Sequence, residues 1–560
     1  MQPEELIQTI PTPKPSLKKL SFCDSNKPQR VIEWASLLRP TQIEVTSSML
    51  YKALPELNQL ITSSQARFQM LEALRPYVQN AIAGLSKSFL HKPISLPPDA
   101  QKSAVIAQAL QKHMVDGYIL VVKAAVESKK NKSTADTMFS TSLHRAMTGI
   151  GLLFMRSYQI YTQPTKGLWQ ILHCLFQISD HFELLDSRVK DETQRLAKIS
   201  SVESAYLRIS LLASARPHQL GQNDISIIYH TFGEWAEQLR FSVDLSSDPD
   251  CFFYLNLERD CGPLYKSRVT DEERQQLLVE LNYKTLLNQI AKQSRESIEE
   301  TGSSTIKVSR EISASLLSHV LETWGNVAQR KQERRQAQMT ADICVGLTDC
   351  HYYVCNGQNF DTFIRNASSP QDIENTATGG FTPRDAFATT QEFDRPVNRV
   401  EVNNISQSGY CLLWKSSTPM RVESGDLVTI REFGKRVWTI GVVRWIRQKK
   451  NASQLGVQIL SDKAQPFGIA QTYDMGGYSD YMRALYLPQS QFSEDPPTLI
   501  TSSAPFQPHD RVKILDGDKT ITAKLDERLF STGPIQQFSF HIIETSETTT
   551  AKKSTGRNWG

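Results

Sequence analysis

The stretch "NNISQSGYCLLW", residues 403–414, runs from a polar turn directly into an apolar segment. Its first part contains the pattern Asn-x-Ser-x-x-Gly at Asn404, Ser406 and Gly409. Asn and Ser side chains donate and accept hydrogen bonds close to the backbone, and glycine adopts conformations that strain other residues. The pattern predicts a polar turn at the rim of a sheet. A ligand-binding role and a purely structural role are its two interpretations.

Runs typical of β-strands surround this turn. They are rich in Val, Ile, Leu and Trp, and turns such as "ESGD" (residues 423–426) and "FGKR" (residues 433–436) separate them. The runs lie at residues 339–354, 400–402, 410–414, 427–430, 437–446 and 455–460. Short strands at this spacing predict a small antiparallel barrel. Residues 355–394 are polar and poor in aliphatic side chains, so we expect a long inserted loop there.

Helical periodicity dominates residues 31–325. The segment "SSQARFQMLEALRPYVQNAIAGL" (residues 63–85) places apolar side chains at three- and four-residue steps, and proline-containing breaks separate many such segments. Further helices are expected at residues 100–127, 140–161, 167–185, 201–215, 225–241, 272–293 and 310–334. An extended segment, "CFFYLNL" (residues 251–257), interrupts them. We expect a large all-α domain that is either a packed scaffold or a binding surface for a protein partner.

Composition restricts the class of protein. The 560 residues include 63 Lys and Arg against 59 Asp and Glu, a formal net charge of +4, which argues against a dedicated binder of duplex nucleic acid. No apolar run reaches the roughly 18 residues that span a bilayer, and no basic segment leads into an apolar one at the start. Eight scattered cysteines suit a reducing compartment. We expect a cytoplasmic protein without a transmembrane segment.

Sequence motifs for catalysis or metal binding are missing. Glu-Ala-Leu at residues 72–74 falls within an amphipathic helix that lacks the carboxylates needed to hold catalytic metal ions. Cys350, His351 and Cys355 lie close together, but strand alternation would direct the first two to opposite faces, and no paired Cys-x-x-Cys completes a zinc site. We therefore expect no enzymatic activity, no metal and no cofactor.

The order of the β elements resembles the PilZ domain, a six-stranded barrel whose family function is binding the bacterial second messenger cyclic di-GMP. In that family an Arg-x-x-x-Arg segment precedes the first strand, and an (Asp/Asn)-x-Ser-x-x-Gly turn opens a later one. Here the turn at Asn404, Ser406 and Gly409 is followed by "YCLLW", "SGDLVTI", "TIGVVRWI" and "LGVQIL" in the family's order. The resemblance covers residues 330–465.

The resemblance also implies arginine ligands, because guanidinium groups bond phosphate oxygens and guanine edges and stack on bases. "QRKQERRQAQ" (residues 329–338) offers Arg330 and Arg334 at the family spacing, with Arg335 beside them, although the pair lies farther from the strand than in the family. The usual distance would instead align Arg334 with Gln338 and lose one arginine. A basic run at a helix end is also commonly a solvated face.

A second pair with the same spacing, Arg395 and Arg399, follows the first strand, which is not where the family carries its motif. This pair either contacts a ligand or only flanks a loop. The ligand-binding residues implied by the resemblance remain Arg330, Arg334, Arg335, Asn404, Ser406 and Gly409.

Together these features predict a multidomain α+β chain: a large all-α domain, a PilZ-like six-stranded antiparallel β-barrel and a small C-terminal β module. The expected boundaries are an N-terminal extension at 1–30, the helical domain at 31–325, the PilZ-like barrel at 326–485 with its inserted loop at 355–394, the β module at 486–546 and a disordered tail at 547–560.

The predicted function is a non-catalytic cyclic di-GMP receptor that couples nucleotide binding at the barrel to a helical domain that binds a protein partner. The alternative is a degenerate PilZ-like scaffold that binds no nucleotide and mediates protein contacts in motility or envelope assembly. A third hypothesis is binding of single-stranded nucleic acid through "RWIRQKK" (residues 444–450), where a tryptophan and basic side chains could stack and pair.

Overall fold

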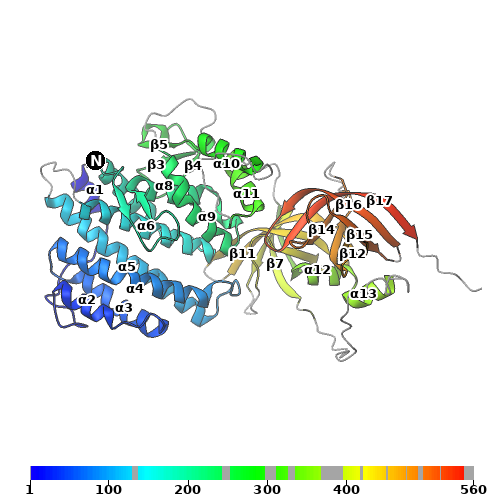
Figure 1. The fold of residues 1–560 in the computed structure, drawn as a ribbon, viewed down its shortest axis with the longest axis horizontal. Helices are drawn as coiled ribbons and strands as arrows, with labels where there is room; N and C mark the ends of the chain where they lie inside the picture. The colour runs from blue at the N-terminus through cyan, green and yellow to red at the C-terminus, as the bar shows by residue number, and fades with distance from the viewer. Residues whose placement is uncertain are drawn as a thin grey trace, which may run out of the picture. The chain divides into compact units, whose positions relative to one another are not determined.

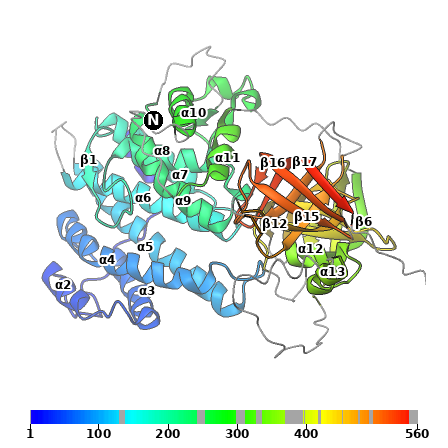
Figure 2. The same cartoon turned by 45° about the vertical axis from the view of Figure 1, so that its right-hand side comes forward.

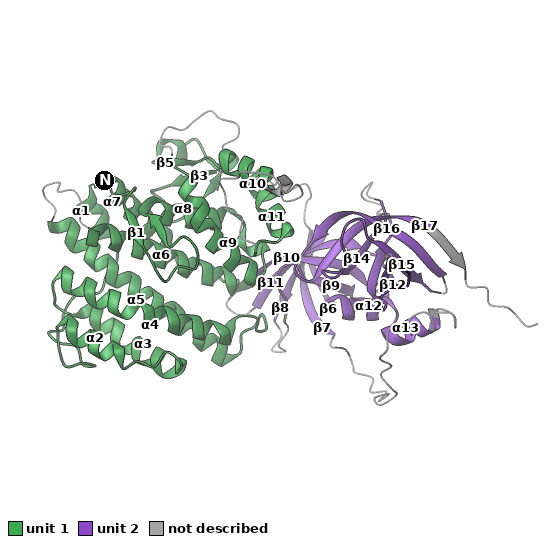
Figure 3. Cartoon of the chain, viewed as in Figure 1, with its two compact units in different colours: residues 1–330, 417–421, 447–450 green, residues 331–416, 422–446, 451–560 purple. Residues whose placement is uncertain are grey.

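The chain forms two compact units, shown in different colours in Figure 3. The helical unit comprises residues 1–330, 417–421 and 447–450, and the β unit comprises residues 331–416, 422–446 and 451–560. This computed structural model describes residues 2–128, 137–241, 253–296, 311–325, 335–367, 395, 397–415, 421–449, 452–473, 476–489, 496–517 and 519–547.

The described helices of the helical unit bury one continuous apolar core. They are α1 (Pro3–Thr9), α2 (Pro28–Ser36), α3 (Ile43–Gln59), α4 (Ser64–Phe89), α5 (Pro98–Ser128), α6 (Thr137–Gln159), α7 (Leu168–His181), α8 (Val202–Ser214), α9 (Gln222–Trp235), α10 (Lys284–Glu296) and α11 (Ala314–Gly325). The helix α1 contributes Leu6 and Ile7 to this core, so the segment expected as an N-terminal extension packs with the helices.

The long helices α4, α5 and α6 lie side by side in both views of the fold (Figures 1 and 2). Gly149 explains why α6 continues through a segment whose glycines weaken its helical pattern. A Cβ atom at Gly149 would lie 2.6 Å from a methyl carbon of Val115 on α5. Glycine is therefore used here for close helix packing, not to end the helix.

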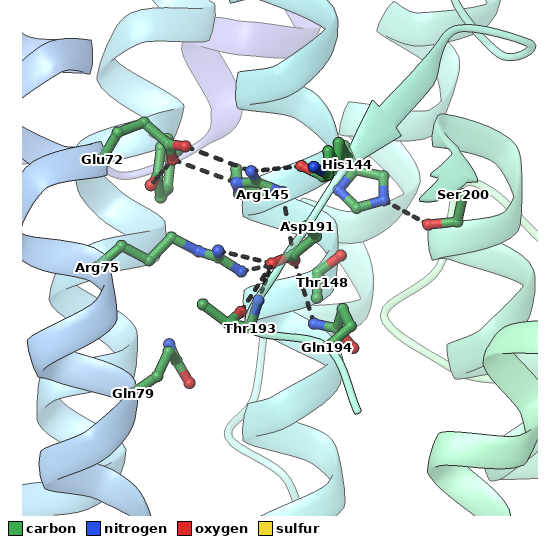
Figure 4. Close-up of polar contacts among 12 residues, drawn as sticks. Glu72, Arg75, Gln79, His144, Arg145, Thr148, Asp191, Thr193, Gln194 and Ser200 are labelled. Atoms are coloured by element: carbon green, nitrogen blue, oxygen red, sulfur yellow. Dashed lines mark hydrogen bonds and ion pairs between the residues drawn. The ribbon is translucent and has the colours of Figure 1, made fainter. Parts of the chain in front are cut away.

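A buried network of charged side chains connects α4 and α6 to the segment after β1 (Arg188–Lys190) (Figure 4). Arg75 donates two hydrogen bonds to the carboxylate of Asp191, at 2.8 and 2.6 Å, and Arg145 lies 3.2 Å from the same carboxylate. Arg145 also contacts Glu72 at 3.2 Å. Glu72, part of the Glu-Ala-Leu sequence, is thus engaged in a structural ion pair.

Short strands interrupt the helices. β1 pairs with β2 (Ile199–Ser201), and a three-stranded sheet has the order β4 (Leu264–Tyr265), β3 (Phe253–Asn256), β5 (Leu278–Leu281). The single helix expected at residues 272–293 is wrong, because β5 pairs with β3 and α10 begins only at Lys284. The Asn282 side chain accepts a hydrogen bond from the Lys284 N–H at 3.0 Å and so starts α10 after the strand.

In the β unit, six described strands close into a first barrel with the order β10-β11-β8-β7-β6-β9. They are β6 (Arg335–Val345), β7 (Asn398–Ser406), β8 (Gly409–Trp414), β9 (Leu427–Glu432), β10 (Thr439–Lys449) and β11 (Ala452–Ser461). The prediction of a six-stranded antiparallel barrel is confirmed.

Six further described strands close into a second barrel with the order β12-β13-β14-β17-β16-β15. They are β12 (Gln465–Gln471), β13 (Met482–Leu487), β14 (Thr498–Ser502), β15 (Arg511–Asp516), β16 (Lys519–Ser531) and β17 (Ile535–Glu547). Residues 465–485 were expected in the first barrel and belong to the second. The first barrel is already closed by the pairing of β10 with β11 and leaves no free edge for β12, which pairs with β13 and β15.

Two helices lie beside the barrels, as the labels in Figure 2 show. The first predicted strand is correct only as β6, because the sequence after Gly346 forms α12 (Leu347–Val354). Gly346 has a φ of +92° and ends the strand with a sharp change of direction. The inserted loop expected at residues 355–394 contains the helix α13 (Phe360–Ala367), and its residues 368–394 lie outside the described chain.

Helix α12 packs between the two barrels. Cys350 shares an apolar cluster with Leu427 and Val442 of the first barrel and with Leu485 and Ile500 of the second. The two barrels are therefore joined by a common buried core.

Candidate functional site

The polar turn joins β7 to β8 at one end of the first barrel. Ser406 is the last residue of β7 and pairs with Gly409, the first residue of β8. The Ser406 hydroxyl donates to the Gly409 carbonyl oxygen at 3.4 Å, and Ile459 of β11 donates its N–H to the Ser408 carbonyl oxygen at 2.9 Å. Asn404 lies two residues before Ser406 and is half-buried. The turn is thus fixed by its own strands and by β11, with polar side chains at its border.

Gly409 is required by close packing of the backbone. A Cβ atom at this position would lie 2.4 Å from the carbonyl oxygen of Val457 on β11. This distance is well inside van der Waals contact, so no other residue fits without moving a strand. The fixed glycine of the motif therefore lets β8 and β11 approach each other at the rim.

Arg335 lies beside this turn. It is the exposed first residue of β6 and is the Cα partner of Ile405, while the next residue, Gln336, is the partner of Asn404. The start of β6 therefore lies next to the end of β7 and its turn. Arg330 and Arg334 lie outside the described residues. The β6 register shifts between Gln336 and Met339, and Gln338 lies within this irregularity.

The second arginine pair is engaged in ion pairs. Arg395 donates to Asp349 of α12 at 2.7 Å, and its guanidinium lies over the ring of Tyr352, 4.7 Å from the ring centroid. Arg399 lies 3.2 Å from Asp342 of β6. These contacts favour a structural role for Arg395, and Arg399 remains largely exposed.

Cys350 and His351 lie on α12 and Cys355 directly follows that helix, so the argument from strand alternation was wrong. Helical spacing gives each side chain a separate environment. Cys350 is fully buried in the cluster between the barrels, and the ring of His351 lies 3.2 Å from the Phe467 carbonyl oxygen. Burial lowers the pKa of His351 to about 4. Within the described residues no group of three His, Cys, Asp or Glu side chains is arranged to hold a metal ion.

In the segment considered for binding single-stranded nucleic acid, residues 444–450, the side chains of Arg444 and Trp445 make contacts within the protein. Arg444 donates to Gln458 at 2.7 Å, and its guanidinium lies 4.4 Å from the ring centroid of Phe530 in the second barrel. The Trp445 indole lies directly over Gly456, where a Cβ atom would come within 2.0 Å of the ring nitrogen. This tryptophan ring is packed on its own sheet.

A polar contact at the same barrel end was missed by sequence reasoning. The Tyr410 hydroxyl donates to the Glu432 carboxylate at 2.8 Å. Burial, followed by the hydrogen bond to Glu432, raises the pKa of Tyr410. The available signal was that Tyr410 directly follows the glycine of the motif, whereas its partner could be found only from the folded barrel.

A closed six-stranded antiparallel barrel with this turn and an arginine at the start of its first strand defines a PilZ-domain protein. Matches to protein families agree: the cyclic-di-GMP receptor FimW N-terminal domain over residues 29–248, its middle PilZ domain over residues 252–395 and 375–466, and the FimW C-terminal beta-barrel domain over residues 467–543. The cyclic-di-GMP receptor FimW of Pseudomonas aeruginosa is 30% identical over 98% of this chain and 95% of its own length. The chain belongs to the FimW family of cyclic-di-GMP receptors.

The matches describe a receptor, in line with the prediction of a protein without catalytic activity. The third matched domain begins at residue 467, close to the start of β12, and so supports the corrected position of the second barrel. In the described part of the chain, no helix is long and apolar enough to cross a membrane.

Proposed function

We propose that this chain binds cyclic di-GMP at the end of its first barrel and passes the bound state to its helical unit without catalysis. Membership of the FimW family carries this proposal. The ligand would contact Arg335, Asn404, Ser406 and Gly409, together with Arg330 and Arg334 of the preceding segment.

The register of β6 supports a common site for these residues. Arg335 of β6 pairs with Ile405 of β7. Its side chain therefore extends from the strand that lies beside the Asn404 to Gly409 turn. A guanidinium offers a planar set of donors that matches phosphate oxygens and guanine edges. The turn adds an amide, a hydroxyl and a closely approached backbone, which together suit a ligand with both phosphates and bases.

The arginine segment also precedes β6 directly and follows the helical unit in the chain. Nucleotide contacts made by this segment are a way to change how the helical unit presents itself to a protein partner. We place this receptor in the cytoplasm, where the nucleotide is a second messenger. We also propose that the helical domain, residues 31–325, binds the protein partner.

Isothermal titration calorimetry of the full chain with cyclic di-GMP tests the proposal. Arg335→Ala and Ser406→Ala are each expected to weaken binding about tenfold or more, because each removes a hydrogen bond to a charged ligand. Arg528→Ala, which removes an exposed arginine of the second barrel, is the matched control and should bind like the wild-type chain. Absence of binding at micromolar wild-type protein would overturn the proposal.

One observation favours the alternative scaffold. If Gln338 occupies the position of the second family arginine, the barrel has lost one ligand group, and Gln338 lies where the β6 register is irregular. A scaffold of this kind would give no calorimetric signal with cyclic di-GMP, and its stability would be unchanged by the nucleotide. Thermal unfolding with and without the nucleotide therefore separates the two functions.

A further inference from the structure

The hairpin between β9 and β10 lies at the same end of the first barrel as the polar turn. The pairs β6–β7, β6–β9 and β7–β8 are antiparallel, so β6 and β8 start at the end where β7 and β9 finish. β10 starts at this end as well, because it is antiparallel to β9. The connection at residues 433–438, "FGKRVW", therefore borders the same barrel end as Arg335 and the Asn404 to Gly409 turn.

One hydrogen bond limits the distance between the turn and this hairpin. Tyr410 follows Gly409 directly, Glu432 precedes Phe433 directly, and their side chains meet at 2.8 Å. β8 and β9 are not neighbours in the barrel, so this bond crosses its end. The strand end that follows the turn and the strand end that precedes the hairpin are thus joined by one side-chain hydrogen bond across the barrel.

The hairpin exposes a large aromatic ring among basic side chains. Phe433 is 72% exposed although its N–H is fixed by a 3.0 Å hydrogen bond to the Thr340 carbonyl oxygen. The guanidinium of Arg399 lies 5.8 Å from the Phe433 ring centroid. Lys435 and Arg436 are exposed on the same connection. An aromatic face beside cationic groups is the chemistry that holds a base and its phosphates in sequence-independent nucleotide binding.

We propose that the β9–β10 hairpin is a second wall of the nucleotide site, with Phe433 stacking on one base of cyclic di-GMP and Arg436 facing a phosphate. This inference rests on the proposed function and adds residues outside the two motifs. We expect Lys435 to contribute less to ligand binding, because its Nζ atom lies 2.6 Å from a carboxylate oxygen of Glu432. Charge complementarity favours this ligand: the hairpin residues 433–438 include two cations and no acid.

Calorimetry with cyclic di-GMP on the full chain tests the hairpin separately from the motifs. Phe433→Ala is expected to weaken binding about tenfold, the usual size of a lost aromatic–base stack. Phe433→Leu, which keeps an apolar side chain but removes the ring, should weaken binding similarly. Phe433→Tyr, which keeps a ring, should bind cyclic di-GMP with the affinity of the wild-type chain. Val437→Ala is the matched control, because Val437 is 57% exposed on the same hairpin and carries no ring.

Arg436→Ala should weaken binding and reduce its dependence on salt concentration, because it removes a charge contact to phosphate. The hairpin assignment would be overturned if Phe433→Ala and Arg436→Ala bound like the wild-type chain while Ser406→Ala lost affinity. That result would leave the proposed function standing. No binding by the wild-type chain would overturn both. Equal losses in Phe433→Ala and Val437→Ala would also contradict stacking, because they would indicate a nonspecific effect on the hairpin.

Discussion

At the scale of single residues, Gly409 shows how one position serves both fold and site. Its place in the motif could be read from the sequence, but its physical reason is the Val457 carbonyl oxygen on a strand nearly fifty positions later, where a Cβ atom would lie at 2.4 Å. Sequence reasoning attributed the glycine to an unusual backbone conformation. The structure attributes it to the close approach of β8 and β11.

Gly409→Ala is expected to lower the free energy of unfolding of the β unit by about 1–3 kcal/mol, because the added methyl group forces the two strands apart. Cyclic di-GMP binding should fall with it, since the turn depends on that register. Thermal unfolding measures the first effect. Gly533→Ala is the control, because a Cβ atom at Gly533 meets nothing within 4 Å; equal stability of the two variants would contradict the packing argument.

In the helical unit, Asp191 is the single residue whose role is tested in the same way as that of Gly409. Burial would raise the pKa of its carboxyl group, but the hydrogen bonds from Arg75 and the charges of Arg75 and Arg145 lower that pKa below its ordinary value. Asp191→Asn leaves these guanidinium groups buried without their shared carboxylate. The expected loss of stability is about 3–5 kcal/mol. Asp186→Asn, at an exposed carboxylate, should change stability little.

The lowered pKa fixes the sign of a pH effect. A carboxylate whose pKa is lower in the folded chain stabilises the fold above its unfolded pKa of about 3.9, and this contribution is lost as the pH falls further. The stability difference between wild type and Asp191→Asn should therefore be roughly constant between about pH 5 and pH 7 and shrink below about pH 4. Urea unfolding at several pH values measures it, and a difference that grows on acidification would contradict the ion-pair assignment.

At the scale of elements, α12 decides how the barrels are built. The sequence "MTADICVGLTDCHYYV" favours a strand throughout, because Ile, Val and Tyr are common in strands. The pattern could not show that the chain leaves the sheet after Val345, because the reason is tertiary: Leu347, Cys350 and Val354 fill the space between two barrels. Similarly, the side chains of Phe360 and Phe363 are buried, and this burial explains why part of a polar segment forms the packed helix α13.

Leu485→Ala, a substitution in the second barrel, is expected to destabilise the first barrel as well. Leu485 is fully buried in the cluster that also contains Leu427 and Ile440 of the first barrel, and such truncations cost about 2–5 kcal/mol. Hydrogen exchange should show reduced protection of amides in β9 and β10. Leu529→Ala, at an exposed leucine, is the control. Protection lost only in the second barrel would mean that the barrels are independent.

At the scale of the whole molecule, the helical unit and the β unit each have their own buried cores. Among the described residues, the large apolar cluster of the helices contains side chains from Leu6 to Trp324, whereas Phe467 and Leu485 belong to apolar clusters of the barrels. We expect calorimetric unfolding in two transitions. Asp191→Asn should lower the midpoint of one and Gly409→Ala the midpoint of the other, whereas a shift of the same transition by both variants would show one cooperative unit.

The sequence by itself determined the helical region, the first barrel and the polar turn, because periodicity and turn residues are local properties of the chain. It also placed Gly409 in a motif with fixed spacing and offered Arg335, beside the Arg330 and Arg334 pair, as a candidate ligand residue. Only the tertiary structure decided that β12 and β13 belong to a second barrel, that α12 joins the two, and that Tyr410 meets Glu432. These facts depend on which strands find a free edge and which side chains meet across a closed barrel, and such contacts join residues that no local pattern connects.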